Sequence, residues 1–325
     1  MPQPISLGLI GAGIMGERML AAIYDRADAP VRAAGIWDPS PEAAARVAAR
    51  FPGLAILDGA EAVIGACDCV YVASPPASHV GHARAALAAG RPVFCEKPLA
   101  VDVAAARALV AEAGGRGAVN FPFASSPGVA TLRDWIEAGS VGRPTGLRIE
   151  VAFAAWPRPW QMDAAGWLDG RREGGFTREV VSHFLFLARR LLGPLDGLAA
   201  RVTYPADGRS ERRIEATFRA GGVPATLVGT VGETERDDTN LWQLEGEAGA
   251  VRLRDWSIAE RRQGGSSGGA FAPAPDAMPN ERARMVSLGR QLDGVARLAR
   301  GAPHHLATLR EALDVQEVVE AVLTS

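Results

Sequence analysis

This chain of 325 residues has little lysine, no large excess of positive or negative charge, and no long apolar run. Lys97 is the only lysine among 35 basic side chains, and the formal net charge is −2. No basic field therefore recruits nucleic acid or an anionic membrane. No apolar run approaches the roughly 20 residues of a membrane span. Residues 1–4 lead directly into the first expected strand and leave no room for a signal peptide, so we expect a cytoplasmic protein.

Cysteine is also rare, with three residues in the chain. Cys67 and Cys69 form a C-x-C, but Cys69 enters an apolar strand and no pair of histidines or further cysteines completes a metal site. Cys95 ends another apolar strand. We interpret all three as core or near-core thiols, which suit a reducing compartment, and we expect no catalytic metal.

A glycine-rich turn follows the first apolar run, residues 5–10. The turn is Gly11-Ala12-Gly13-Ile14-Met15-Gly16, and an amphipathic stretch comes after it. In a G-x-G-x-x-G of this kind the first glycine makes the tight turn, the second admits a pyrophosphate, and the third brings helix and strand together. The helix start, with Ile14 and Met15, directs unpaired N–H groups at the phosphates. The pattern predicts a dinucleotide site.

An acidic residue stands where such a site needs one. Asp38 ends a second apolar run, residues 31–37, and lies 22 residues after Gly16, the position of the carboxylate that holds a ribose diol. Asp38-Pro39-Ser40-Pro41 is also good turn and helix-capping chemistry, and both roles can hold at once. The Asp38 carboxylate would repel a 2′-phosphate, and no arginine directly follows Asp38 to bind such a phosphate. We therefore expect NAD(H) to be preferred, with NADP(H) as the alternative.

Strand and helix patterns alternate up to about residue 120, which favours a doubly wound parallel sheet. The expected strands are residues 5–10, 31–37, 54–57, 69–73, 92–95 and 117–120, with helices such as 41–51 and 78–89 between them. Ligands bind beyond the carboxyl ends of such strands. We therefore expect three loops to meet there: residues 11–16, residues 74–79, and Glu96-Lys97-Pro98.

The pattern changes in the second part of the chain, where strands predominate. We expect a helix at residues 129–138, strands at 145–155, 198–205, 212–219, 223–232, 239–245 and 249–254, a long helix at 176–192, a surface loop at 261–280, and closing helices at 280–300 and 306–323. This indicates an α+β domain with an open, mainly antiparallel sheet. The expected domains are residues 1–121 and 122–325.

Lys97 comes directly after an expected strand. Pro98 moves it away from helical backbone geometry and toward an extended one. A lysine held there can hydrogen-bond a substrate oxygen and stabilise developing alkoxide charge. The alternative is an exposed lysine paired with Glu96.

A second cluster occupies residues 174–183, Gly-Gly-Phe-Thr-Arg-Glu-Val-Val-Ser-His. On a helix, Glu179 and His183 are four residues apart and share a face. A histidine beside a carboxylate suits general acid–base catalysis. The alternative is a buried histidine satisfied by a neighbour. Arg178 can hold a substrate carboxylate, or simply pair with Glu179 or Glu173.

Aromatic side chains precede this cluster. They are Phe121, Phe123, Trp156, Trp160 and Trp167. Together they suggest apolar faces suited to stacking against a sugar ring or an aromatic substrate, while core or interface packing is the alternative for each one.

The order of these motifs resembles the glucose–fructose oxidoreductase / inositol dehydrogenase / rhizopine-catabolism (Gfo/Idh/MocA) superfamily. The glycine-rich loop, the strand-terminal Glu96-Lys97-Pro98 and the helix with an acid and a histidine occur in that order. Ser74-Pro75-Pro76 with Ser78-His79, the stretch 127–144 and the tail 312–321 extend the resemblance over nearly the whole chain.

The resemblance implies a Rossmann domain, an open-sheet domain that forms homodimers or homotetramers, and an NAD(P)-dependent dehydrogenase or reductase acting on CH–OH groups. It places Lys97 and His183 near the reacting carbon, with Glu179 where the family commonly has aspartate. The cofactor contacts expected are Gly11, Gly13, Ile14, Met15, Gly16, Asp38, Ser74, Pro75, His79, Glu96 and Lys97. The substrate contacts expected are Lys97, Phe123, Trp160, Arg178, Glu179 and His183.

The substrate class that the resemblance implies is a sugar or cyclitol. Dehydrogenation of a cyclic dihydrodiol or reduction of an imine is the enzymatic alternative, suggested by the aromatic residues. The alternative from another class is a non-catalytic dinucleotide-binding sensor. Retention of both Lys97 and His183 argues against a sensor, because a protein that only binds the dinucleotide needs neither.

Overall fold

The computed structural model describes residues 3–236, 238–264 and 269–325. The chain forms two compact units, Met1–Ser125 with Met285–Leu313, and Ser126–Arg284 with Asp314–Ser325. We expected one boundary, between residues 121 and 122. The structure instead assigns residues 285–313 to the first unit, although they come late in the chain. In the part of the chain that the structure describes, no helix is long and apolar enough to cross a membrane.

The first unit is built on a six-stranded sheet in the order β14-β5-β4-β3-β1-β2. Its elements are β1 (Ile5–Ile10), α1 (Ile14–Tyr24), β2 (Val31–Trp37), α2 (Pro41–Arg50), α3 (Ala60–Ala66), β3 (Cys69–Val72), α4 (Pro76–Ala88), β4 (Val93–Cys95), α5 (Val103–Ala113), β5 (Gly117–Val119), η1 (Pro122–Ser125), most of α9 (Asn280–Ala299) and β14 (Ala307–Thr308). β1 to β5 pair in parallel and β14 pairs antiparallel with β5. This confirms the doubly wound parallel sheet.

The strands of this sheet are largely apolar because both of its faces are covered. β1 is buried along its whole length, and Leu292 and Val295 of α9 belong to the same core cluster as Leu7 and Leu9. The expected strand at 54–57 is reduced to an isolated bridge between Ile36 and Ile56.

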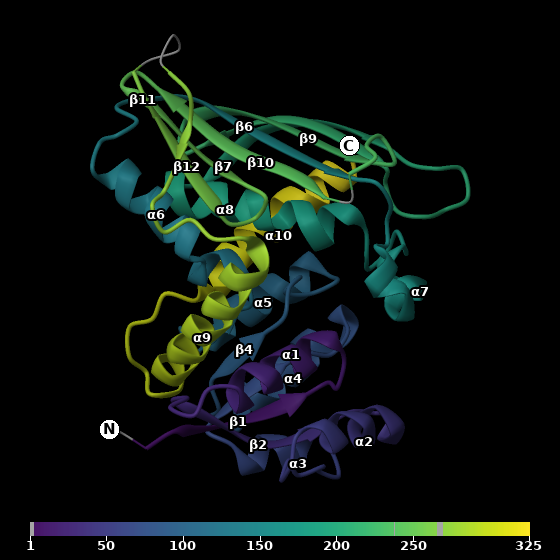
Figure 1. Cartoon of the computed structure of the whole chain (residues 1–325). Coiled ribbons are helices and arrows are strands. Elements are labelled where there is room, and N and C mark those ends of the chain that lie inside the picture. The colour runs from purple at the N-terminus through teal and green to yellow at the C-terminus, as the bar shows by residue number, and fades with distance from the viewer. Residues whose placement is uncertain (1–2, 237, 265–268) are drawn as a thin grey trace. The chain divides into compact units, whose positions relative to one another are not determined.

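The second unit contains an eight-stranded sheet in the order β13-β12-β11-β10-β6-β9-β8-β7 (Figure 1). Its elements are α6 (Pro127–Glu137), β6 (Pro144–Phe153), η2 (Pro159–Ala164), α7 (Ala165–Leu168), η3 (Thr177–Val181), α8 (Ser182–Leu192), β7 (Leu195–Thr203), β8 (Arg213–Ala220), β9 (Val223–Val231), β10 (Thr239–Gly246), β11 (Gly249–Arg254), β12 (Ile258–Gln263), β13 (Ala272–Pro273) and the last part of α10 (Leu309–Leu323). All pairs are antiparallel except β6 with β9. The open, mainly antiparallel sheet is confirmed.

One face of this sheet packs on helices and the other is open. Buried and more exposed residues alternate along β6, β8 and β10, as expected of a sheet with one covered face. α8 supplies Phe184, Leu185, Phe186 and Leu187 to the core. The expected loop at 261–280 was wrong in two places, because β12 extends to Gln263 and pairs with β11, and β13 pairs with β12.

Candidate functional site

The glycine-rich loop of the first unit has the geometry that its sequence predicts. Gly11 has φ +112°, and a Cβ there would lie 2.6 Å from the carbonyl of Ala73. A Cβ on Gly16 would lie 2.2 Å from the Gly11 oxygen. These two glycines are therefore required by the close approach of the loop to β3 and to itself.

Gly13 is different, because a Cβ there would meet nothing within 4 Å. Gly13 stands at the start of α1 and has no side-chain cap. The first N–H groups of a helix lack intrahelical partners, so Ile14 and Met15 lie where amides can bind an anion. This uncapped helix start and the open space at Gly13 fit the pyrophosphate of a dinucleotide.

Asp38 holds the loop from the neighbouring strand. Its Oδ2 accepts a hydrogen bond from the Ala12 N–H at 2.7 Å, and its Oδ1 accepts from the Ser40 N–H at 2.8 Å. Ser40 in turn caps α2 by accepting from the Ala43 N–H at 3.1 Å. The turn role of Asp38 is confirmed. The ribose role stays a prediction, and a carboxylate has further lone pairs to accept a diol.

His79 lies between two of the predicted loops. It is 1% exposed, with Nδ1 2.8 Å from the Pro98 carbonyl oxygen and Nε2 2.7 Å from that of Ser74. Burial lowers the pKa of His79, while the hydrogen bonds to these two carbonyls raise it. This burial argues against direct cofactor contact and shows His79 joining the Ser74 loop to the Lys97-Pro98 segment.

The Glu96 side chain is buried within the first unit. Its Oε1 accepts hydrogen bonds from the Tyr71 hydroxyl and, at 2.6 Å, from Asn120 Nδ2. Gln291 of α9 donates to Asn120 Oδ1 at 2.5 Å. Burial and the Glu96 carboxylate raise the pKa of Tyr71. The network ties β3, β4, β5 and α9 together at the point where the half-buried Lys97 follows β4.

Sequence reasoning missed both Tyr71 and Gln291. The signal for Tyr71 was a hydroxyl-bearing residue inside an apolar strand, Cys-Val-Tyr-Val, since a buried hydroxyl requires a partner. No local signal points to Gln291, which comes from a helix far along the chain.

The second unit contains the other predicted cluster, which begins at two glycines. Gly175 has φ +109°, and a Cβ there would lie 2.8 Å from Glu211 Oε2. Glu211, which is 1% exposed, accepts from the Thr177 N–H at 2.5 Å. Burial raises the pKa of Glu211, against the lowering effect of the Thr177 hydrogen bonds. Glu211, which the sequence analysis did not single out, thus anchors the start of the helix.

The helix begins with a π-turn, Thr177–Val181, before α8. The expected helix at 176–192 is therefore present, but its first turn closes with bonds five residues apart. Glu179 lies in this π-turn and His183 lies in the first turn of α8, so the shared helix face expected for the two side chains stays a prediction. His183 lies edge-on to Trp256, with ring centroids 5.9 Å apart.

Arg178 pairs with Glu320, not with Glu179 or Glu173. Its Nε and Nη2 donate to the two Glu320 carboxylate oxygens at 2.7 Å each. Its Nη1 donates to the carbonyls of Arg171 and Gly174. This arrangement uses most of the guanidinium donors and argues against the expected substrate contact.

The aromatic residues divide into two groups. Phe121 and Phe123 are 3% and 4% exposed, and Trp156 packs on Phe153 while donating from Nε1 to the Leu168 carbonyl. For these three the packing alternative fits, and the burial of Phe123 argues against substrate contact. Trp160 is 47% exposed, and the Arg158 guanidinium lies over its ring, 4.7 Å from the centroid.

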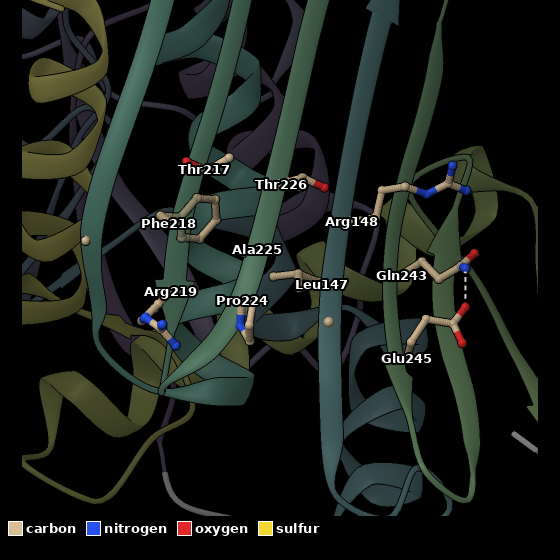
Figure 2. Close-up of a pocket in the computed structure, with 12 residues that line it drawn as sticks. Leu147, Arg148, Thr217, Phe218, Arg219, Pro224, Ala225, Thr226, Gln243 and Glu245 are labelled. Carbon is tan, nitrogen blue, oxygen red and sulfur yellow. Dashed lines mark hydrogen bonds between the residues drawn. The ribbon is translucent and has the colours of Figure 1, made fainter. Parts of the chain in front are cut away.

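A shallow hollow lies on the sheet of the second unit, and none of the predicted catalytic residues is among its lining residues. Figure 2 shows its lining: Gly146, Leu147, Arg148, Gly197, Thr217, Phe218, Arg219, Pro224, Ala225, Thr226, Gln243 and Glu245. All come from β6 to β10 or the turns beside them. In the described residues, no group of three or more His, Cys, Asp or Glu side chains could hold a metal ion.

Comparison with protein families gives two matches. Residues 5–122 match an oxidoreductase family model described as an NAD-binding Rossmann fold. Residues 129–252 match the GFO/IDH/MocA C-terminal domain. The two matches together take in most of the chain and both of the predicted clusters.

Individual relatives are dehydrogenases. The chain is 35% identical to inositol 2-dehydrogenase of Acidothermus cellulolyticus over 151 residues, 44% of this chain and 43% of the relative. It is 27% identical to levoglucosan dehydrogenase of Pseudarthrobacter phenanthrenivorans over 77% of this chain and 66% of the relative. The chain thus spans less than half the length of the inositol dehydrogenase.

Among solved structures, the chain is similar in fold to an oxidoreductase from Agrobacterium radiobacter in complex with NAD+, L-tartaric acid and magnesium. The TM-score is 0.83 at 21% identity, with 99% of this chain and 96% of the other covered.

Proposed function

Because the chain belongs to the GFO/IDH/MocA oxidoreductase family, with an NAD-binding Rossmann domain, we propose that it is an NAD(P)-dependent dehydrogenase of a small polyhydroxylated substrate, a sugar or cyclitol. The dehydrogenase relatives support the activity and the substrate class. The observation that carries the proposal is the uncapped helix start with open space at Gly13, because the amides there would bind a pyrophosphate.

Asp38 is the basis for proposing NAD(H), and not NADP(H), as the cofactor. Its carboxylate would accept hydrogen bonds from an unmodified ribose diol and repel a 2′-phosphate, so we propose NAD(H) over NADP(H). Ser74, Pro75, Glu96 and Lys97 would complete the cofactor contacts.

Lys97 and His183 carry the protein's share of the chemistry. The nicotinamide, when bound, accepts or donates the hydride. Lys97 would hydrogen-bond the substrate oxygen and stabilise negative charge as the carbinol is oxidised. His183 would accept the hydroxyl proton and return it in the reverse direction, with Glu179 four residues earlier in the same helical segment.

The open sheet of the second unit supports a homodimer or homotetramer. The hollow in Figure 2 is lined on the exposed side of the sheet by Arg148, Thr217 and Thr226, and this is the surface on which a second copy of the chain would pack. The free, buried cysteines Cys67, Cys69 and Cys95 support a cytoplasmic location.

The test is a binding titration with NADH and NADPH followed by a turnover screen over sugars, cyclitols, dihydrodiols and imines. We expect tighter binding of NADH and turnover of a sugar or cyclitol. Lys97→Met and His183→Asn should lose turnover while retaining NADH binding. Tight binding without turnover on any substrate would favour a dinucleotide sensor, and binding of neither nucleotide would overturn the proposal.

A further inference from the structure

Trp256 packs on the helix that carries His183. The indole lies edge-on to the His183 imidazole, with the ring planes at 77° and the centroids 5.9 Å apart. It also contacts the Phe184 ring, 5.1 Å away between centroids. An edge-to-face contact with a large rigid ring restricts the orientations that a neighbouring side chain can adopt.

The backbone at Trp256 is unusual. Asp255 has φ 49° and Trp256 has φ 67°, and these are the only non-glycine residues with positive φ in the described ranges. They form the turn between β11 and β12. Left-handed backbone is unfavourable for a residue with a Cβ, and such residues concentrate at functional sites where surrounding contacts hold them in place.

The side chains of Asp238, directly before β10, and Asn240, near the start of β10, supply those contacts. The Trp256 backbone N–H donates to Asn240 Oδ1 at 2.8 Å, and its indole Nε1 donates to Asp238 Oδ2 at 2.6 Å. Asn240 Nδ2 donates to Asp238 Oδ1 at 2.9 Å. Both N–H groups of Trp256 are therefore fixed, and the two acceptors are fixed to each other.

From this arrangement we propose that Trp256 is a positioning residue, which holds the His183 imidazole in the orientation needed for proton transfer, and that Asp238 and Asn240 hold Trp256. The inference rests on the proposed function, in which His183 moves the substrate proton. Trp256 touches His183 and acts only through it. The strained turn places the indole ring against the imidazole.

The test compares substitutions that remove the ring or its anchor with substitutions that keep them. Trp256→Leu should lower kcat about 10- to 100-fold, the cost of a small misplacement of a catalytic group, with the KM for substrate and the Kd for NADH nearly unchanged. Trp256→Phe keeps a ring but loses the indole N–H that Asp238 accepts, so its kcat should lie between those of Trp256→Leu and the unmodified protein. Asp238→Leu should lower kcat, whereas Asp238→Asn keeps an acceptor for the indole and should not.

A spectroscopic measurement tests the contact without turnover. In the NMR spectrum of the protein, the ring-proton resonances of His183, identified by their loss in His183→Asn, should move in Trp256→Leu because the indole ring current is lost. Trp135→Leu is the matched control. Trp135 packs against the Arg261 guanidinium, and its removal should change neither kcat nor these resonances.

The outcomes separate this inference from the proposed function. If His183→Asn retains full turnover, the acid–base role of His183 fails, and with it the proposed proton transfer and this inference. If His183→Asn is inactive but Trp256→Leu keeps both kcat and the His183 resonances, the positioning role alone is overturned. Should Trp256→Leu not fold, equal kcat for Asp238→Leu and the unmodified protein overturns it.

Discussion

Nδ1 of His79 lies 2.8 Å from the carbonyl oxygen of Pro98, directly after the only lysine of the chain. Nε2 of the same ring reaches Ser74, so one buried imidazole connects two loops that follow neighbouring strands. A neutral imidazole donates to one of these carbonyls, so His79→Leu should leave that carbonyl without a donor and cost about 1–3 kcal/mol of unfolding free energy. Urea denaturation measures it, and His79→Gln, which keeps a donor, should lose less.

The pH dependence of stability is a second consequence of that burial. Burial lowers the pKa of His79 in the folded state, so the unfolded chain binds the proton more readily. Stability is then fully present above the ordinary histidine range, about pH 6.5, and is lost as the pH falls through it. Urea midpoints of the unmodified protein should fall more steeply toward acid pH than those of His79→Gln. Parallel curves would contradict this.

The glycines at positions 13 and 16 should respond differently to substitution. Gly13→Val adds a side chain in open space, so the fold should persist while the Kd for NADH rises at least about tenfold, or about 1.4 kcal/mol. Calorimetric titration measures the Kd. Gly16→Ala places a Cβ against the Gly11 oxygen and should destabilise the fold by about 1–3 kcal/mol. Normal NADH binding by Gly13→Val would contradict the proposed pyrophosphate site.

Because Lys97 is the only lysine in the sequence, its side-chain amine can be labelled selectively and followed by NMR. Reductive methylation with 13C-formaldehyde should label Lys97 and the α-amino group and no other amine, because the remaining basic side chains are arginines. We expect NADH to shift the Lys97 methyl resonance in the NMR spectrum. The α-amino resonance is the internal control. A shift of neither resonance at saturating NADH would contradict the predicted contact, and Lys97→Arg identifies the signal.

Gly175 should be sensitive to a single methyl group. Its φ of +109° is unfavourable for alanine, and the Cβ would lie 2.8 Å from Glu211 Oε2. Gly175→Ala should therefore lower stability by about 1–3 kcal/mol and reduce kcat by displacing the helix that carries His183. Gly208→Ala is the matched control, since Gly208 has φ +78° with nothing within 4 Å. Thermal unfolding and kcat should change more at position 175.

Arg178 and Glu320 should behave as a structural pair. The two side chains are mostly buried and hydrogen-bonded at both carboxylate oxygens, so a double-mutant cycle of Arg178→Gln and Glu320→Gln should give a coupling of about 1–3 kcal/mol in unfolding free energy. The KM for substrate should stay nearly constant in Glu320→Gln. A large rise of KM in Arg178→Gln alone would restore the substrate-binding interpretation.

Local sequence determined the features of this protein that depend on residues close together in the chain. The turn at Gly11 and the close approach at Gly16 follow from backbone geometry that only glycine satisfies. The turn role of Asp38 depends locally on the Ser40 amide, two residues on, whereas its bond to the Ala12 amide also requires the pairing of β1 with β2. The alternation of apolar strands and helices predicted the doubly wound sheet for the same reason, since burial on both faces requires continuous apolar strands.

Only the tertiary structure decided which distant side chains complete these local units. Glu211 anchors the helix start at Thr177, Glu320 takes Arg178, and Trp256 packs on His183. No periodicity connects such residues, because their pairing depends on which strands and helices become neighbours. A charged or aromatic side chain has many acceptable partners in sequence, and burial together with geometry selects the one that satisfies its hydrogen bonds.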